Sequence, residues 1–181
     1  MKLEGKKVAI LATDGFEQVE LTEPKKALEA AGAQVQIVSP KEGEIRGWNF
    51  TDWGLSLAVD VPLNSAHPGD FDALVLPGGQ MNPDNLRTLP EVQKFVQAFF
   101  QAKKPVGAIC HAPWILIDAG TAKGRKLTSY HTIKTDLVNA GALWLDQEVV
   151  VDNGLVTSRN PNDLPAFGNK LIEEIAEGVH A

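Results

Sequence analysis

The segment KPVGAICHAPWILIDAG, residues 104–120, decides the fold. Its first part, PVGAIC, is a short apolar run typical of a buried strand, and APWILIDAG predicts a helix that ends at a glycine. A strand that passes directly into a helix is the repeating unit of an α/β fold. Cys110, the only cysteine in the chain, stands at this junction, and His111 follows it directly.

The rest of the chain repeats this alternation. Strands are predicted at residues 6–12, 33–40, 72–79 and 105–110, with a hairpin over 148–158 that turns at Asn153 and Gly154. Helices are predicted at residues 17–31, 90–104, 112–120, 133–142 and 164–179. Pro24 either kinks the first helix or marks its true first turn, and residues 41–70, rich in turn residues, are left unassigned. The pattern predicts one α/β domain over residues 1–181, a mostly parallel sheet with helices on both faces.

Composition limits the function classes. The chain has 181 residues, a net charge of -6 and one cysteine, so it has no internal disulfide framework and suits the reducing cytoplasm. We expect no secretory signal and no membrane span. The negative charge disfavours nucleic acid as a stable partner. The histidines, at positions 67, 111, 131 and 180, lack the spacing of a zinc site, so we expect no metal and no cofactor.

In such sheets, functional residues lie where strands end and helices begin. Three predicted strand ends are followed by residues capable of chemistry: Glu17 and Glu20, Gly78 and Gly79, and Cys110 and His111. Cys110, between the small residues Ala108 and Ala112, resembles the serine of a nucleophile elbow. A lone cysteine is commonly a small core residue, but N–H groups at a helix start favour a thiolate. We therefore expect a reactive thiol with a lowered pKa.

The neighbouring residues suggest supporting roles. His111 is a candidate general base or acid, although consecutive side chains usually point apart, and its backbone N–H is a candidate oxyanion donor. Gly79 is a candidate second donor, because a glycine lets the backbone approach a substrate closely. Glu17 and Glu20 share one face of the predicted helix. Most glutamates in a first helical turn lie on the surface, but one facing the thiol could hold a proton and donate a hydrogen bond to the sulfur.

Four segments together resemble the PfpI family, intracellular-protease-like proteins of the class I glutamine amidotransferase-like superfamily, related to the parkinsonism-associated deglycases. They are KKVAILATDGFEQVELTEP, FDALVLPGGQMNPDNLR, KPVGAICHAPWILIDAG and the stretch from LTSYHTIKTDLVNAGA to NDLPAF, which together cover almost the whole chain. The resemblance implies a single-domain flavodoxin-like sandwich. It implies Cys110 as nucleophile with His111 beside it, and Glu20 as the thiol's hydrogen-bond partner, with Glu17 as the less favoured stand-in. Gly79 and the amide of His111 match the oxyanion donors.

The resemblance also implies substrates and self-association. The sequence departs from the family pattern at two places. Members are described as cysteine peptidases, as glyoxalases or deglycases acting on methylglyoxal adducts, and as stress proteins, and they assemble as homodimers or homohexamers. Family peptidases complete the triad with an acidic residue of a neighbouring subunit, where this chain offers only the shorter Asp84. The segment GEIRGWNFTDWGLSL, with Trp48 and Trp53, is longer than usual, and we expect it to shape the pocket mouth or a subunit contact.

Two functions remain open. The first is a cysteine-dependent stress enzyme of hydrolase type, a peptidase or a deglycase or glyoxalase, that acts on small carbonyl compounds, glycated adducts or peptides. The second is a redox sensor or holdase chaperone in which Cys110 is oxidised and nothing is turned over. A glutaminase subunit would need a His-x-Glu pair near the C-terminus, and only His180 occurs there.

Overall fold

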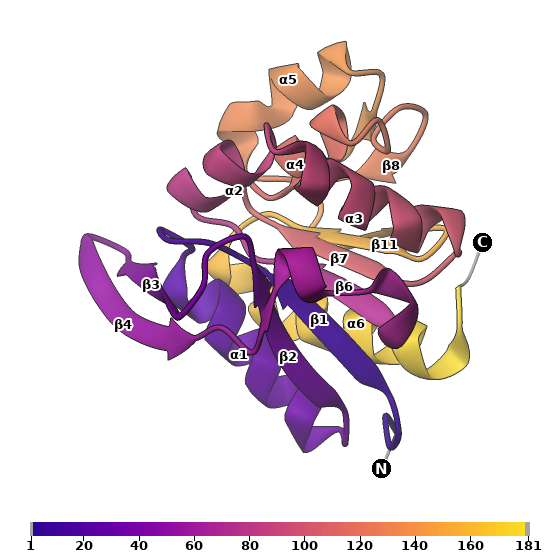
Figure 1. The fold of residues 1–181 in the computed structure, drawn as a ribbon. Helices are drawn as coiled ribbons and strands as arrows, with labels where there is room; N and C mark the ends of the chain where they lie inside the picture. The colour runs from indigo at the N-terminus through magenta and orange to yellow at the C-terminus, as the bar shows by residue number, and fades with distance from the viewer. Residues whose placement is uncertain (1, 180–181) are drawn as a thin grey trace.

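The central feature of the computed structural model, which describes residues 2–179, is a seven-stranded sheet (Figure 1). Its strands, in spatial order, are β10 (Val150–Asp152), β11 (Leu155–Ser158), β7 (Val106–Ile109), β6 (Ala73–Leu76), β1 (Lys7–Leu11), β2 (Gln34–Ser39) and β5 (Val61–Pro62). All neighbours are parallel except β10 and β11, which form the predicted hairpin at Asn153 and Gly154. Both turn residues have positive φ, as such a tight turn requires.

Helices cover both faces of the sheet, as the alternating pattern predicts (Figure 1). On one face lie α1 (Gln18–Ala30) and α6 (Leu164–Glu177), which pack against each other. On the other lie α2 (Met81–Leu86), α3 (Pro90–Gln101), α4 (Pro113–Asp118) and α5 (Lys134–Asn139). Each layer buries an apolar cluster, with Leu21 and Phe167 in the first and Phe99 and Leu116 in the second. The flavodoxin-like α/β sandwich is therefore confirmed.

Pro24 lies inside α1, six residues after its start, so it does not mark the first turn. A proline has no N–H to donate to the carbonyl four residues earlier, here that of Glu20. The helix nevertheless continues to Ala30, because its buried face, including Leu21 and Leu28, packs into the core. Tertiary packing thus outweighs the local break.

The unassigned segment contains an antiparallel hairpin, β3 (Glu44–Asn49) and β4 (Asp52–Ala58), that projects from the sheet (Figure 1). Backbone hydrogen bonds attach it to the loop after β1: Gly15 N donates to Arg46 O at 2.8 Å and Trp48 N to Phe16 O at 2.7 Å. A small two-stranded sheet of β8 (Lys126–Leu127) and β9 (Leu143–Trp144) completes the strands. Within residues 2–179, no helix is both long and apolar enough to span a membrane.

Candidate active site

Three central strands, β7, β6 and β1, lie side by side and run in the same direction, so the loops after them meet at one edge of the sheet. Cys110 follows β7 directly and adopts φ 64°, in the left-handed region that non-glycine residues rarely occupy. Its backbone is fixed on both sides, because Cys110 N donates to Ser158 O at 3.0 Å and Tyr130 N donates to Cys110 O at 2.8 Å. The predicted elbow is present, and its strained turn directs the sulfur into a cavity.

His111 reaches the sulfur although it is the adjacent residue. Its Nδ1 lies 3.2 Å from Cys110 Sγ, and its Nε2 lies 3.3 Å from Thr132 Oγ1. The ring is stacked on Tyr130, with 4.8 Å between ring centroids, and lies 5.2 Å from the ring of Trp114. Burial lowers the pKa of His111 to about 4, helped by the charge of His131. The imidazole is therefore neutral at neutral pH and able to accept a proton.

Glu20 is the fully buried carboxyl beside the thiol. Its Oε2 accepts a hydrogen bond from Gly78 N at 3.0 Å, whereas Oε1 has no partner of ordinary geometry within residues 2–179. The thiol of Cys110 nevertheless interacts with this carboxyl and favours its charged form. Burial raises the pKa of Glu20 to about 8, against the lowering effect of Cys110. At neutral pH the carboxyl therefore keeps a proton next to the sulfur.

The glycine pair after β6 is required by close packing. A Cβ on Gly78 would lie 2.4 Å from Glu20 Oε2 and 2.6 Å from Cys110 Cβ, so no side chain fits. Gly79 adopts φ 76°, and a Cβ there would lie 2.6 Å from the backbone N of Glu17. Backbone N–H groups of Gly79 and His111 both interact with the Cys110 thiol by hydrogen bonding. These two predicted oxyanion donors therefore converge on the sulfur.

The expectation of a lowered thiol pKa is wrong for this resting site. Burial raises the pKa of the Cys110 thiol, and the carboxylate form of Glu20 raises it further. The N–H groups of Gly79 and His111 act in the opposite direction but do not outweigh burial. The helix that was expected to activate the thiol, α4, spans only Pro113–Asp118, so its dipole is small. The thiol is therefore protonated at rest.

The remaining candidates, Glu17 and Asp84, do not contact the thiol. Glu17 lies at the start of α1, where its Oε1 accepts a hydrogen bond from Phe50 N at 3.2 Å, so Glu20 alone holds the position beside the sulfur. Asp84 lies on α2, exposed, with Oδ1 3.6 Å from Arg87 Nε. Within its own chain it makes no contact with His111, whose second partner is Thr132.

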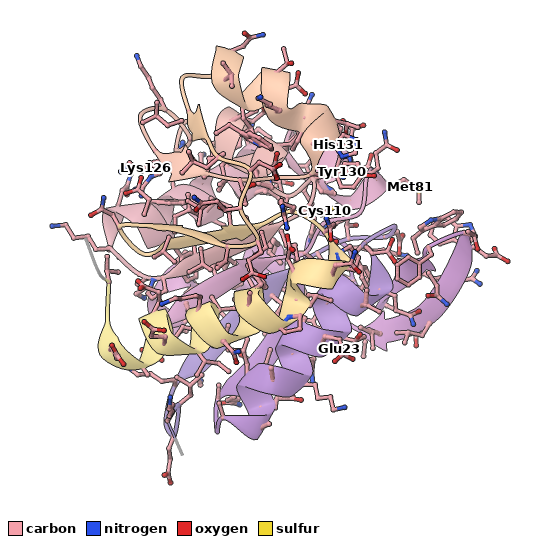
Figure 2. The ribbon with its side chains drawn as sticks, turned by 180° about the vertical axis from the view of Figure 1, so that it is seen from behind. Glu23, Met81, Cys110, Lys126, Tyr130 and His131 are labelled. Carbon is pink, nitrogen blue, oxygen red and sulfur yellow. The ribbon has the colours of Figure 1, made fainter. Side chains whose placement is uncertain are left out.

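A cavity of about 760 Å³ opens onto this site. Its wall includes Trp48 and Phe50 from the β3–β4 hairpin, the segment expected to shape the pocket mouth. It also includes residues that the sequence patterns did not indicate, namely Met81 from α2, and Tyr130 and Thr132. In Figure 2, Cys110, Tyr130, His131 and Met81 lie on the same side of the molecule. Only the polar cluster TSYHT, between two predicted elements, could have drawn attention to Tyr130 and Thr132. Within residues 2–179 no cluster of metal-ligating side chains occurs, and His180 lies outside the described residues.

The chain matches a known family over most of its length, since the sequence profile of the DJ-1/PfpI family aligns with residues 6–174. The chain belongs to the DJ-1/PfpI family. The residues that resemble family motifs are those that the fold brings together, Cys110, His111, Glu20 and Gly79. The family assignment from sequence segments is therefore confirmed.

Named relatives of this DJ-1/PfpI chain differ in the activity that their names carry. "Putative cysteine protease YraA" of Bacillus subtilis is 45% identical over 168 residues, which cover 92% of this chain and 96% of the relative. General stress protein 18 of the same organism is 44% identical over 170 residues, covering 93% and 96%. Deglycase PfpI of Pyrococcus furiosus is 42% identical over 167 residues, covering 92% and 98%. Among solved structures, Drosophila melanogaster DJ-1beta superposes with a TM-score of 0.86 at 29% identity, covering 94% and 90% of the two chains.

Proposed function

We propose that this protein is a cysteine-dependent stress enzyme of hydrolase type that acts on methylglyoxal or its adducts, as a deglycase or glyoxalase. The observation that carries the proposal is the 3.2 Å approach of His111 Nδ1 to Cys110 Sγ, at a turn where two backbone N–H groups converge on the sulfur. Such an arrangement supplies a nucleophile, a base and an oxyanion site together. Relatives named deglycase and general stress protein support this choice.

The resting site favours attack coupled to proton transfer. The thiol is protonated and the imidazole is neutral, so forming a separate thiolate and imidazolium would bury two charges. Transfer of the thiol proton to Nδ1 while Sγ attacks a carbonyl carbon avoids a free buried thiolate, because the negative charge forms on the carbonyl oxygen instead of on the sulfur. The oxygen of that carbonyl develops its negative charge between the N–H groups of Gly79 and His111.

Glu20 supplies a second proton within the site. Because its carboxyl remains protonated up to a pKa of about 8, it can donate a hydrogen bond to the sulfur or a proton to the bound intermediate. Water then displaces the sulfur from the bound carbon, so the C–S bond breaks, and the proton held on Nδ1 of His111 returns to the sulfur as the product leaves. We expect this chemistry in the cytoplasm, where a lone thiol stays reduced.

A substrate panel tests the proposal. Methylglyoxal, its adduct with a small thiol, and a peptide are each incubated with the wild type and with Cys110→Ser, and substrate loss is followed. Turnover of the carbonyl compounds that is lost in Cys110→Ser supports the proposal. Turnover of the peptide alone would favour the peptidase reading, suggested by the name of one relative. No turnover of any substrate would overturn the enzymatic function.

The second candidate function is a redox sensor or holdase. It is favoured by the buried, protonated Glu20 beside the only cysteine, because the carboxyl could hydrogen-bond an oxidised sulfur. Mild peroxide should then add two oxygens to Cys110 and largely stop, since no second cysteine exists to form an internal disulfide. Mass spectrometry measures the distribution of oxidised forms of Cys110 in the wild type and in Glu20→Gln. Equal product distributions in the two proteins would remove Glu20 from that role.

A further inference from the structure

The cavity over Cys110 has an unusual charge balance. Its ionisable wall residues are Glu17, Glu20, Cys110, His111 and Tyr130, and no lysine or arginine of residues 2–179 contributes to it. With Glu20 protonated and His111 neutral at neutral pH, Glu17 is the remaining carboxyl of the wall. Partial burial raises the pKa of Glu17, whereas hydrogen bonds from the backbone N–H groups of Phe50 and Gln18 favour its charged form. The cavity therefore presents a negative potential to whatever enters it.

The nearby lysine and arginine side chains are engaged elsewhere, and His131, whose ring centroid lies 4.5 Å from that of Tyr130, is not part of the cavity wall. Lys41 pairs with Asp14 at 2.8 Å, and Arg159 pairs with Asp163 at 2.9 Å. The guanidinium of Arg87 lies over the ring of Trp114, 4.9 Å from its centroid, and that of Arg46 lies 5.6 Å from the centroid of Trp53. None of these side chains neutralises Glu17, which forms no ion pair with any described residue.

The positive side chains gather instead around a separate cavity of about 710 Å³ at the opposite end of the sheet. Lys104 and Arg125 belong to its wall, together with Lys126, which lies far from Cys110 in Figure 2. Lys104 precedes the first residue of β7, whereas Cys110 follows the last, so the two cavities lie at opposite strand ends. The fold thus places this lysine- and arginine-lined cavity away from the reactive thiol.

Glu17 is held in place by the hairpin at the mouth of the cavity. Its Oε1 accepts the N–H of Phe50, a residue with φ 57°, so the side chain is fixed to the β3–β4 turn. The aromatic rings of Trp48 and Phe50 belong to the same wall. A carboxylate beside aromatic rings is a favourable environment for an ammonium or guanidinium group, through charge attraction and cation–π contact.

We propose that Glu17, with Trp48 and Phe50, forms a cation subsite that selects substrates bearing a positive charge close to the reactive carbonyl. The inference rests on the proposed function for its substrate class, namely carbonyl adducts carried by basic peptides or amino thiols. Adducts whose carrier bears a carboxylate are disfavoured by the same charge. Glu17 is thus a specificity residue that acts on the substrate, separate from the Glu20 that faces the sulfur.

Charge-selective labelling of Cys110 tests the subsite without requiring turnover. Trimethylammonioethyl, hydroxyethyl and sulfonatoethyl methanethiosulfonate are of similar size and differ in charge. Each labelling rate is divided by the rate of the same reagent with mercaptoethanol in solution. In the wild type the cationic reagent should exceed the anionic one by at least about tenfold, as expected when one unit charge a few ångströms away, largely screened by water, attracts the cation and repels the anion. Added salt should reduce the ratio.

Three variants separate charge from structure. Glu17→Gln keeps an acceptor for Phe50 N and should bring the ratio close to one, whereas Glu17→Asp keeps the charge and should retain the preference. Glu23→Gln removes a carboxylate from the outer part of α1, away from Cys110 in Figure 2, and should leave the ratio unchanged. Equal wild-type rates, faster anionic labelling, or an unchanged ratio in Glu17→Gln would each overturn the proposal.

Turnover of charged and neutral substrates then tests the cation subsite and the proposed enzymatic function separately. Methylglyoxal hemithioacetals of thiocholine, mercaptoethanol and mercaptoacetate are cationic, neutral and anionic. Consumption of the neutral adduct tests the proposed function alone. The ratio of kcat/KM for the cationic and anionic adducts tests the subsite, and should fall on the order of tenfold in Glu17→Gln. Selective labelling without turnover of any adduct would refute the proposed function and leave the cation subsite standing.

Discussion

The Nδ1 atom of His111 lies 3.2 Å from the Sγ atom of Cys110, although the two residues are consecutive in the chain. The contact depends on the φ of 64° at Cys110, which rotates the backbone so that both side chains enter one cavity. At an extended backbone the two side chains would point apart. The strained turn therefore creates the reactive pair.

Replacing the nucleophile should remove the activity and leave the fold intact. In Cys110→Ser we expect turnover of carbonyl substrates to fall by at least about 10³-fold, because the hydroxyl is a far poorer nucleophile. The melting temperature should change little, since serine is similar in size and fits the same turn. Steady-state kinetics and thermal unfolding check this pair of outcomes. Substantial residual turnover would eliminate the covalent mechanism.

The buried carboxyl should make stability depend on pH. Below pH 4.5 Glu20 is protonated in both folded and unfolded chains, and between 4.5 and about 8 only the unfolded chain loses the proton. Relative to Glu20→Gln, the wild-type free energy of unfolding should fall across this window by about 1.4 kcal/mol per pH unit, and the difference should be constant above it. Urea unfolding at several pH values measures this. Parallel curves for the two proteins would contradict a raised pKa, and Glu23→Gln serves as the surface control.

Thr132 should act as a positioning residue through His111. Thr132→Val removes the hydroxyl 3.3 Å from Nε2 and should lower kcat roughly fivefold, the rate equivalent of about 1 kcal/mol for a neutral hydrogen bond. KM should change little, and Thr132→Ser should restore kcat. The pH profile of kcat should shift in the valine variant, because the partner that orients the imidazole is lost. An unaltered kcat and profile would show that Thr132 does not orient the ring.

Adding a methyl group at Gly78 should disrupt the site. Its Cβ would lie 2.6 Å from both Cys110 Cβ and the backbone oxygen of Ile109, and neither can move freely. We expect Gly78→Ala to lose about 2 kcal/mol of stability and most of its activity. Gly69→Ala is the control, because nothing lies within 4 Å of that position. Denaturant unfolding of both variants, with turnover, gives the comparison, and equal stability would show that the site relaxes around the methyl group.

The β3–β4 hairpin should contribute to self-association. Phe50 is 60% exposed and Trp53 42% exposed, and Trp48 packs edge-on against Trp53 at 5.5 Å. Such an aromatic surface is typical of interfaces, so the wild type should be at least a dimer, and Trp48→Ala with Trp53→Ala should shift it towards monomer. Light scattering tests both expectations. A monomeric wild type would contradict the predicted assembly. An intact oligomer in the variant would show that the two tryptophans are not needed for the interface.

A mixing experiment extends this prediction to Asp84. If Asp84 of one subunit completes the site of another, Asp84→Ala should be impaired, and mixing it with the inactive Cys110→Ser should restore activity. The mixed oligomer then contains sites with both residues present. Failure of the mixture to regain activity would show that Asp84 has no role across subunits.

The sequence by itself determined the α/β alternation, the hairpin at Asn153 and Gly154, and the elbow at Cys110. These features depend on residues close together in the chain: apolar runs, glycine stops, and small residues around the cysteine. Local patterns therefore suffice for them. The same patterns did not place the hairpin over Glu44–Asn49 and Asp52–Ala58, whose short strands lie among turn residues.

The local residue pattern did not distinguish Glu17 from Glu20, and only the family resemblance favoured Glu20 as the carboxyl beside the sulfur. Only the tertiary structure decided which residue contacts the far nitrogen of His111 and how the thiol titrates. Glu20 and Gly78 are 58 residues apart in sequence, and Thr132 lies 21 residues from His111, so their contacts arise from parallel strands that end at one sheet edge. The pKa of Cys110 was predicted in the wrong direction because it depends on burial, which the assembled layers create and no short segment contains.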